Sequence, residues 1–193
     1  MRRANDFYPT PAWATDLLLQ QAGLCGDLCA ELCCGNNDIT RQLRASGRFS
    51  RVLTNDLDKT RDSDTHYDAA RRMTYSRYAD LGWAMPCWVV TNPPFNAAAQ
   101  IVPLAYDFAT IGIAMLLRLS FLEPVEDRGA WLNEHPPTSM IVLPRISFTG
   151  DGKTDSVTCA WMVWEKSKTG TITVAENPKF AKREHRQEAM SFA

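Results

Sequence analysis

The sequence predicts a single α/β domain built on a mostly parallel sheet, with an antiparallel last strand and helices on both faces. Short apolar runs rich in β-branched residues alternate with longer helical patterns along most of the chain. The last two apolar runs follow each other without a helix between them, as an antiparallel pair at the edge of such a sheet does. The length of 193 residues suits one domain over positions 1–193.

The composition is that of an ordinary globular protein, with 45% hydrophobic and 22% charged residues. No apolar run approaches the roughly 18 residues needed to cross a bilayer. The charged start of the chain has no apolar stretch behind it, so it is not a signal peptide. We therefore expect a cytoplasmic protein without a membrane partner. A net charge of −1 is not typical of a protein that coats nucleic acid without sequence preference, but it is compatible with a local basic surface at one cleft.

Four of the six cysteines crowd together at Cys25, Cys29, Cys33 and Cys34. A zinc site normally shows two C-x2-C pairs separated by a longer loop, and this spacing lacks them. A radical-type cluster would need a cysteine where Leu32 stands. The alternative to a metal site is a set of small buried residues on a strand, which we favour. No metal is expected.

The first helix is predicted over residues 12–22. Pro11 suits the first turn, Thr10 is the expected N-cap, and Gly23 ends the helix. A strand over 27–33 follows.

A tight turn at 34–37 then leads into a helix over 38–46. The run 51–55 reads as a second strand that ends at the acidic positions 56–58. The polar stretch 59–76 has no clear period, so it is predicted to be a flexible loop or to hold a short helix at 68–73. Residues 78–80 are predicted to end a short third strand.

The second half of the chain repeats this alternation. Residues 87–91 predict a β-branched strand, 97–109 a helix and 111–117 another buried strand. The final pair of strands is predicted over 139–143 and 156–164, joined by a polar loop at 149–156, and the charged tail from Glu176 is predicted to be a helix or a frayed end.

Polar groups follow each of the first four predicted strands, where an open α/β sheet binds its ligands. At the first of these ends, Gly35 permits close approach, and Asn37 tolerates a left-handed backbone. The turn lacks the second glycine and the lysine of a phosphate cradle. Glu31 would pair with a cationic amine and Asp56 with ribose hydroxyls, a combination that describes an aminoacyl nucleoside such as S-adenosylmethionine. Taken singly, these two residues are also explained by a salt bridge and a turn.

Residues 92–95, Asn-Pro-Pro-Phe, carry the candidate chemistry. The two prolines fix the backbone and remove two N–H donors, so the Asn92 side-chain oxygen and the Pro93 carbonyl face the cleft as acceptors. Two rigid acceptors can hold both hydrogens of an exocyclic amine and free its lone pair for attack. Phe95 can stack on a base. The alternative is a plain turn after a strand.

These residues resemble the Rossmann-like amino-methyltransferases, specifically the N6-adenine DNA methyltransferases of phages and prophages. Residues 92–95 match the family's Asn/Asp-Pro-Pro-Tyr/Phe motif, and residues 7–11 resemble its N-terminal motif. The resemblance implies S-adenosylmethionine as cofactor and places catalysis on Asn92, Pro93, Pro94 and Phe95. It implies cofactor binding by Tyr8, Thr10, Pro11, Glu31, Cys33, Gly35, Asn37, Asp56, Asp80, Leu81 and Asn92, with Asp58 as a lesser candidate for the ribose.

The family's usual glycine turn is altered here, because Glu31 replaces an aspartate and Asn37 occupies the second glycine position. Arg145 and Phe148 lie between the last two strands, where relatives often place an aromatic residue on the extruded base, so both are candidate substrate contacts. They can equally be a surface arginine and a core phenylalanine. Scattered basic residues, Arg118 and Arg128 among them, are candidate phosphate contacts.

The resemblance implies methyl transfer to N6 of an adenine flipped out of DNA, most naturally double-stranded DNA. Other planar amines remain open: adenine in RNA, cytosine N4 and protein glutamine. A non-catalytic methyltransferase-like subunit that binds nucleic acid is the alternative from another class. The target sequence and the oligomeric state are not determined by the sequence.

Overall fold

The computed structural model describes residues 8–81, 83, 85–146, 157–170 and 172 of the chain. The strands in these ranges form a six-stranded sheet in the order β2-β1-β3-β4-β6-β5. The strands are β1 Gly26–Glu31, β2 Phe49–Thr54, β3 Trp88–Thr91, β4 Gly112–Arg118, β5 Ser139–Val142 and β6 Cys159–Glu165. The helices are α1 Ala12–Ala22, α2 Asp38–Ala45, α3 Arg72–Asp80, α4 Ala98–Phe108 and α5 Glu126–Glu134, with a 3-10 turn η2 at Leu119–Leu122.

The sheet is parallel from β2 to β4 and antiparallel at its other side. β1 pairs in parallel with both β2 and β3, and β3 pairs in parallel with β4. β6 runs antiparallel to β4 and to β5, which confirms the predicted antiparallel end of the sheet. The chain first steps from β1 out to β2 and then returns to β3 on the other side of β1. This reversal opens a crevice at the carboxyl ends of β1 and β3, where ligands of open α/β sheets bind.

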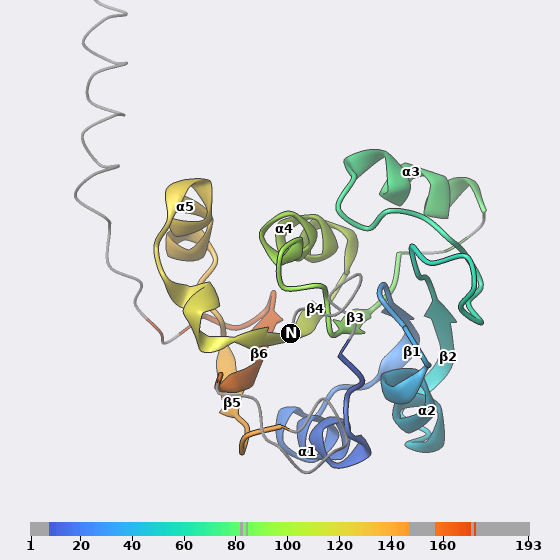
Figure 1. Cartoon of the computed structure of the whole chain (residues 1–193), viewed down its shortest axis with the longest axis horizontal. Helices are drawn as coiled ribbons and strands as arrows, with labels where there is room; N and C mark the ends of the chain where they lie inside the picture. The colour runs from blue at the N-terminus through green and yellow to red at the C-terminus, as the bar shows by residue number, and fades with distance from the viewer. Residues whose placement is uncertain (1–7, 82, 84, 147–156, 171, 173–193) are drawn as a thin grey trace, which may run out of the picture.

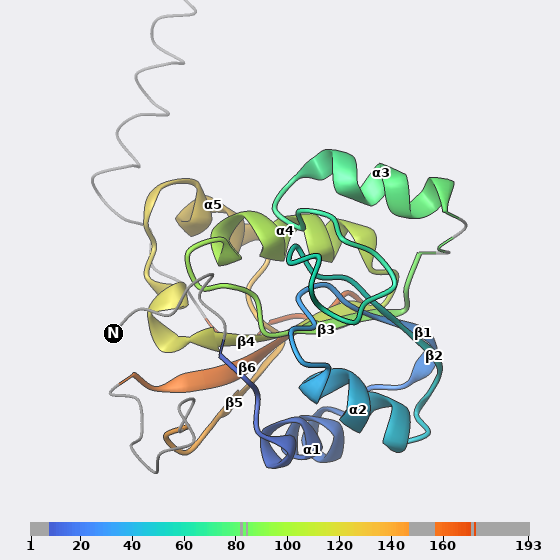
Figure 2. The same cartoon turned by 45° about the vertical axis from the view of Figure 1, so that its right-hand side comes forward.

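Helices cover both faces of the sheet, as predicted. Figures 1 and 2 show α1 and α2 below the sheet and α3, α4 and α5 above it. The lower core joins Leu18 and Leu43 of these helices to Trp161 of β6, and the upper core joins Ile101 of α4 to Met115 of β4. None of the helices in the described ranges is long and apolar enough to cross a lipid bilayer.

The first helix has the predicted bounds but a different start. Gly23 ends α1 in the left-handed region, at φ 64°, as expected. Pro11 itself occupies the N-cap position, and no side chain caps the helix. The prediction that Thr10 caps α1 is therefore wrong. Thr10 is buried, and its hydroxyl accepts a hydrogen bond from the Asn92 side chain instead.

The predicted strand at 78–80 is wrong, because these residues form the last turn of α3. Tyr78 is fully buried, stacks on Trp83 with ring centroids 4.6 Å apart, and lies 5.6 Å from the ring of Phe108 on α4. Thr74, one helical turn before Tyr78, is buried on the same side of the helix. The short helix predicted at 68–73 therefore starts and ends later than expected.

The segment between β2 and α3 makes a single bridge to the edge of the sheet, Asn55 with Thr65. The buried Asn55 side chain organises this segment, since its Nδ2 donates to the carbonyls of Leu32 and Tyr67 at 2.9 Å each. Its Oδ1 accepts from the Thr65 hydroxyl and the Tyr67 amide. One amide group thus uses its hydrogen-bonding capacity to hold the loop beside β2. The predicted loop at 149–156 and the tail from Glu176 lie outside the described residues.

Candidate active site

A pocket of about 420 Å³ opens at the carboxyl ends of β1, β2 and β3, in the crevice that the topology creates. It is the place where the sequence predicts the site. Seven of the predicted residues line it: Tyr8, Thr10, Glu31, Cys33, Asp56, Asn92 and Pro94. Residues from the start, the first third and the middle of the chain therefore meet at one cavity.

The pocket also contains residues that the sequence did not single out for it. They come mainly from the start of α2, from the loop after β2 and from the residues after the Asn-Pro-Pro motif: Pro9, Cys34, Asp38, Ile39, Leu57, Arg61, Asn96 and Ala97. Asp58, a lesser candidate for the ribose, lines the pocket as well. Apart from Pro9, they lie in the segments that follow strand ends, which identifies a region of the chain but not the side chains that turn inward.

Glu31 is the last residue of β1 and is buried at the base of the pocket, with 1% of its surface exposed. It accepts a hydrogen bond from the Thr40 hydroxyl on α2. Burial raises the pKa of Glu31 to about 8, and the hydrogen bonds from Thr40 only partly offset this effect. A buried carboxyl that holds its proton near neutral pH would release it to pair with a cationic group. This is the group to which an amine in the pocket would bind.

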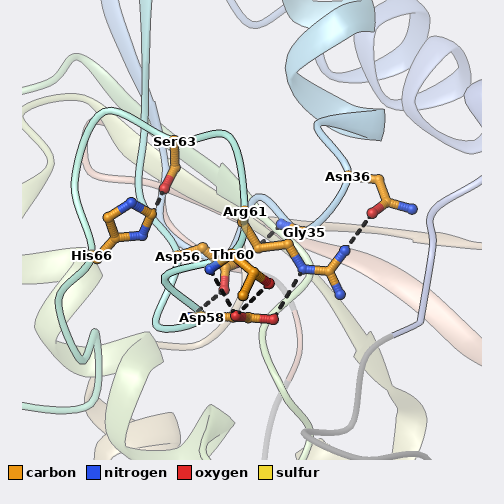
Figure 3. A network of polar contacts seen from close by, with 8 residues as sticks. All are labelled: Gly35, Asn36, Asp56, Asp58, Thr60, Arg61, Ser63 and His66. Carbon is orange, nitrogen blue, oxygen red and sulfur yellow. Dashed lines mark hydrogen bonds and ion pairs between the residues drawn. The ribbon is translucent and has the colours of Figure 1, made fainter.

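Asp56 and Gly35 hold the glycine turn against the end of β2 (Figure 3). The Gly35 amide donates to Asp56 Oδ2 at 2.8 Å, and the Asp58 amide donates to Asp56 Oδ1 at 2.9 Å. Gly35 has φ 52°, which fits glycine. Each carboxylate oxygen can accept a further hydrogen bond, so Asp56 can still accept hydrogen bonds from hydroxyl groups of a ligand in the pocket.

Asn37 adopts the left-handed conformation that the sequence predicts, with φ 60°. Its Nδ2 donates to the Asp62 carbonyl at 2.7 Å, so the side chain is tied to the loop after β2. Next to it, the Arg61 guanidinium donates to Asn36 Oδ1 and pairs with the Asp58 carboxylate at 3.3 Å (Figure 3). These contacts fasten the turn to the loop from Asp56 to Asp62. The altered second glycine position thus contributes an anchoring side chain and does not line the pocket.

The Asn92 amide is held from one end. Its Nδ2 donates to the Tyr8 carbonyl at 2.9 Å and to the Thr10 hydroxyl at 3.1 Å. A carbonyl can only accept, so the NH2 group must be the end that faces Tyr8. Among the described residues, nothing donates a hydrogen bond to Asn92 Oδ1. The N-terminal segment therefore fixes the amide with its oxygen available to a ligand.

Phe95 lies beside this amide and contacts two side chains. Its ring stacks with that of Tyr8, with centroids 5.5 Å apart and planes 29° apart. The Arg118 guanidinium at the end of β4 lies over the Phe95 ring, 4.4 Å from its centroid. Pro93 is buried and Pro94 is half-buried. The Asn-Pro-Pro-Phe segment is thus fixed by the N-terminal segment and by the end of a neighbouring strand.

Several predicted site residues lie apart from the pocket. Asp80 and Leu81 are exposed at the end of α3 and do not line it, so the structure does not place them at a cofactor. Their predicted position depended on a strand that does not form. Arg145 is exposed beyond β5, Pro11 starts α1, and Phe148 lies outside the described residues.

The charges of the pocket favour a cationic, hydroxyl-bearing ligand. The carboxyl groups of Glu31, Asp38, Asp56 and Asp58 line it together with one guanidinium, that of Arg61, among the described residues. Carboxylates bind amines and hydroxyls and repel phosphate groups. These acidic groups therefore fit an aminoacyl nucleoside and do not fit a nucleoside triphosphate.

No protein-family model matches the sequence, and no curated protein matches it either. Solved structures do match. One is a type I restriction-modification methyltransferase subunit from Streptococcus thermophilus, with a TM-score of 0.59, 14% identity, and coverage of 84% of this chain and 45% of that chain. Another is an O-methyltransferase from Bacillus cereus solved with S-adenosylhomocysteine, with a TM-score of 0.56, 13% identity, and coverage of 86% and 84%.

A third match, named as a candidate hemolysin from Lactococcus lactis, has a TM-score of 0.60, 12% identity, and coverage of 93% of this chain and 98% of that chain. At these identities the likeness concerns the fold, which proteins with different activities share. The strand order, the antiparallel β6 and the matched structures agree on this point. The chain has the Rossmann-like fold of S-adenosylmethionine-dependent methyltransferases.

Proposed function

We propose that this protein is an S-adenosylmethionine-dependent methyltransferase that acts on N6 of adenine in DNA. The observation that carries the proposal is the fixed amide of Asn92, whose NH2 group is held by Tyr8 and Thr10 while its oxygen stays available beside the pocket. An acceptor fixed in this way suits an amine that must present both of its hydrogens. The type I methyltransferase subunit among the similar structures supports DNA as the substrate.

The pocket residues divide the cofactor between them. Glu31 would pair with the amine of the methionine part, and Asp56 would accept hydrogen bonds from the ribose hydroxyls. Tyr8 and Thr10, which hold Asn92, also line the cavity, so the same segment would contact the cofactor and orient the catalytic amide. When bound, S-adenosylmethionine supplies an electrophilic methyl group on a sulfonium.

The chain's own residues would prepare the amine. Asn92 Oδ1 and the Pro93 carbonyl accept hydrogen bonds from its two N–H groups and draw the nitrogen towards tetrahedral geometry. These two acceptors would leave the nitrogen lone pair free to receive the methyl group that the bound cofactor supplies. The surplus proton on nitrogen leaves to water. No side-chain base is required before the bond forms.

Incubation of the purified protein with labelled cofactor and DNA, followed by nucleoside analysis, tests this function. We expect label in N6-methyl-2′-deoxyadenosine. Label in N4-methyl-2′-deoxycytidine, or transfer to RNA or to protein glutamine in parallel incubations, would move the substrate to another planar amine. No binding of S-adenosylmethionine in calorimetry at high concentration would favour the non-catalytic subunit instead.

The Asn92→Ala variant tests the role of the amide. We expect kcat to fall at least about a hundredfold, in line with the loss of one preorganised catalytic hydrogen bond. Cofactor affinity, measured by calorimetry, should change only a few-fold, because Glu31 and Asp56 remain.

Thr10→Val is the matched control, since it removes one partner of Asn92 Nδ2 and leaves Oδ1 untouched. Loss of one neutral hydrogen bond should lower kcat by about tenfold at most. Equal losses in the two variants would mean that Asn92 only tethers the N-terminal segment, and unimpaired transfer by Asn92→Ala would overturn the mechanism.

A further inference from the structure

Arg118 is a basic residue at the edge of the candidate site whose hydrogen-bonding groups are not used within the described part of the chain. It ends β4, next to the strand that leads into Asn92. Its guanidinium lies over the Phe95 ring, 4.4 Å from the centroid. The Arg118 Nε is buried and has no hydrogen-bond partner among the described residues. A buried N–H without a partner is costly, so its retention calls for an explanation.

Arg128 provides an internal comparison. It too lies over a phenylalanine ring, that of Phe121, at 5.2 Å. Its Nε and a terminal nitrogen donate to the Glu123 carbonyl at 3.2 and 2.9 Å. Arg128 therefore bridges the η2 turn and α5, as a structural arginine does. Arg118 also stacks on a phenylalanine ring, but no carbonyl group among the described residues accepts a hydrogen bond from it, so its donors remain available to a ligand.

The charges around the two sides of the site differ. The cofactor pocket is lined by the carboxyl groups of Glu31, Asp38, Asp56 and Asp58, which would repel a nucleic-acid backbone. Arg118 does not line that pocket and lies on the Phe95 side of it. A guanidinium that stacks through its face keeps its edge N–H groups free, and this edge matches two oxygens of a phosphate.

We propose that Arg118 is a substrate-binding residue that holds the backbone phosphate next to the target base. This inference rests on the proposed function and adds to it the group that positions the nucleic acid. The guanidinium fixes Phe95 with its face and binds the phosphate with its edge. Phe95 and Asn92 then receive a nucleotide whose backbone is already in place.

The test compares Arg118→Gln with Arg118→Lys and with the matched variant Arg128→Gln. Methyl transfer to duplex DNA is measured at several salt concentrations, with thermal unfolding of each variant as a check on folding. We expect Arg118→Gln to raise KM for DNA about tenfold or more, as loss of a charge-assisted hydrogen bond does, while kcat changes less than threefold. The slope of log affinity against log salt should fall by about one.

Arg118→Lys should keep the salt slope and recover part of the affinity, because the charge remains. Arg128→Gln should keep the slope of the unaltered protein. A fall in kcat with an unchanged salt slope in Arg118→Gln would mean that Arg118 only positions Phe95, and the inference would be wrong while the proposed function stands. If the unaltered protein transfers no methyl group to DNA, the proposed function fails first and the inference fails with it.

Discussion

At the scale of single residues, Glu31 shows how the pocket pairs burial with charge. A glutamate with 1% exposure would ordinarily be paired with a cation, but among the described residues this one accepts hydrogen bonds only from Thr40. With a pKa of about 8, Glu31 is mostly protonated at neutral pH when no ligand is bound. A cationic ligand would replace the proton, so ligand binding and proton release are linked.

This linkage makes stability depend on pH. Between the ordinary carboxyl pKa of 4.5 and about 8, the unfolded chain gives up its Glu31 proton while the folded chain keeps it. The free energy of unfolding of the ligand-free protein should therefore fall as pH rises through this window. Urea unfolding at pH 6 and pH 8.5 measures the fall.

Glu31→Gln should remove most of this pH dependence, because glutamine is neutral throughout and can still accept from Thr40. It should also weaken S-adenosylmethionine binding at least about tenfold, since a charged pair is lost. If Glu31→Gln unfolds with the same pH dependence as the unaltered protein, another group titrates and the burial argument for Glu31 is wrong.

Residue chemistry also marks the limit of what the sequence could predict for the site. Glu31, Asp56 and Asn92 could be chosen because each lies at or just beyond the end of an apolar strand, and strand ends meet at one edge of a parallel sheet. Arg61 could not, because it sits in a polar loop whose path is set by the buried Asn55 side chain. Loop residues have no periodicity that reports their direction.

At the scale of elements, the turn between β1 and α2 carries the clearest departure from the resembled family. Asn37 stands where a second glycine is expected, and it keeps the left-handed backbone at φ 60°. Its side chain holds the Asp62 carbonyl and turns away from the pocket. Asparagine at this position therefore has less backbone freedom than glycine, but its side chain adds a hydrogen bond between the turn and the loop after β2.

Two substitutions at this position separate backbone conformation from the tie. Asn37→Ala should destabilise the fold by about 1–2 kcal/mol, because alanine resists the left-handed region and the hydrogen bond is lost. Asn37→Gly should cost less, because only the tie is lost. Thermal unfolding should show the alanine variant melting about 2–8 °C lower than the unaltered protein. A glycine variant that melts lower than the alanine variant would contradict this account.

The helix α3 shows why one element escaped prediction. Tyr78-Ala79-Asp80 resembles a short strand end when read alone. Burial of Tyr78 with Thr74, four residues apart, is a helical spacing, and the decisive contacts are to Trp83 and to Phe108 on another element. Such aromatic packing depends on the tertiary structure. The strands at 87–91 and 111–117 were predictable because short, mainly apolar runs with β-branched residues indicate a buried strand without reference to a distant partner.

At the scale of the whole molecule, β4 is the strand on which both cores and the site depend. It pairs with β3 on one side and β6 on the other, and it ends at Arg118 beside the site. Gly112 begins β4 at a position where neighbouring atoms leave no room for a side chain. A Cβ atom there would lie 2.2 Å from the Trp164 carbonyl oxygen and 2.9 Å from the Trp88 ring.

Gly112→Ala should therefore destabilise the whole protein by about 3 kcal/mol or more, since backbone atoms of β6 must shift. Gly23→Ala is the matched control, because a Cβ there meets nothing within 4 Å and only the left-handed φ of 64° is strained. That control should cost about 1–2 kcal/mol. Urea unfolding of both variants measures the difference, and equal costs would show that the sheet adjusts at Gly112.

The acidic lining of the pocket also bears on turnover. Under the proposed function, methyl transfer converts a sulfonium into a neutral thioether, so the bound ligand loses one positive charge while Glu31, Asp38, Asp56 and Asp58 stay in place. The electrostatic attraction then weakens at the moment the reaction is complete. The demethylated cofactor should therefore dissociate more readily than S-adenosylmethionine does. Product inhibition should ease as salt is lowered, because weaker screening widens the difference in affinity between the two cofactor forms.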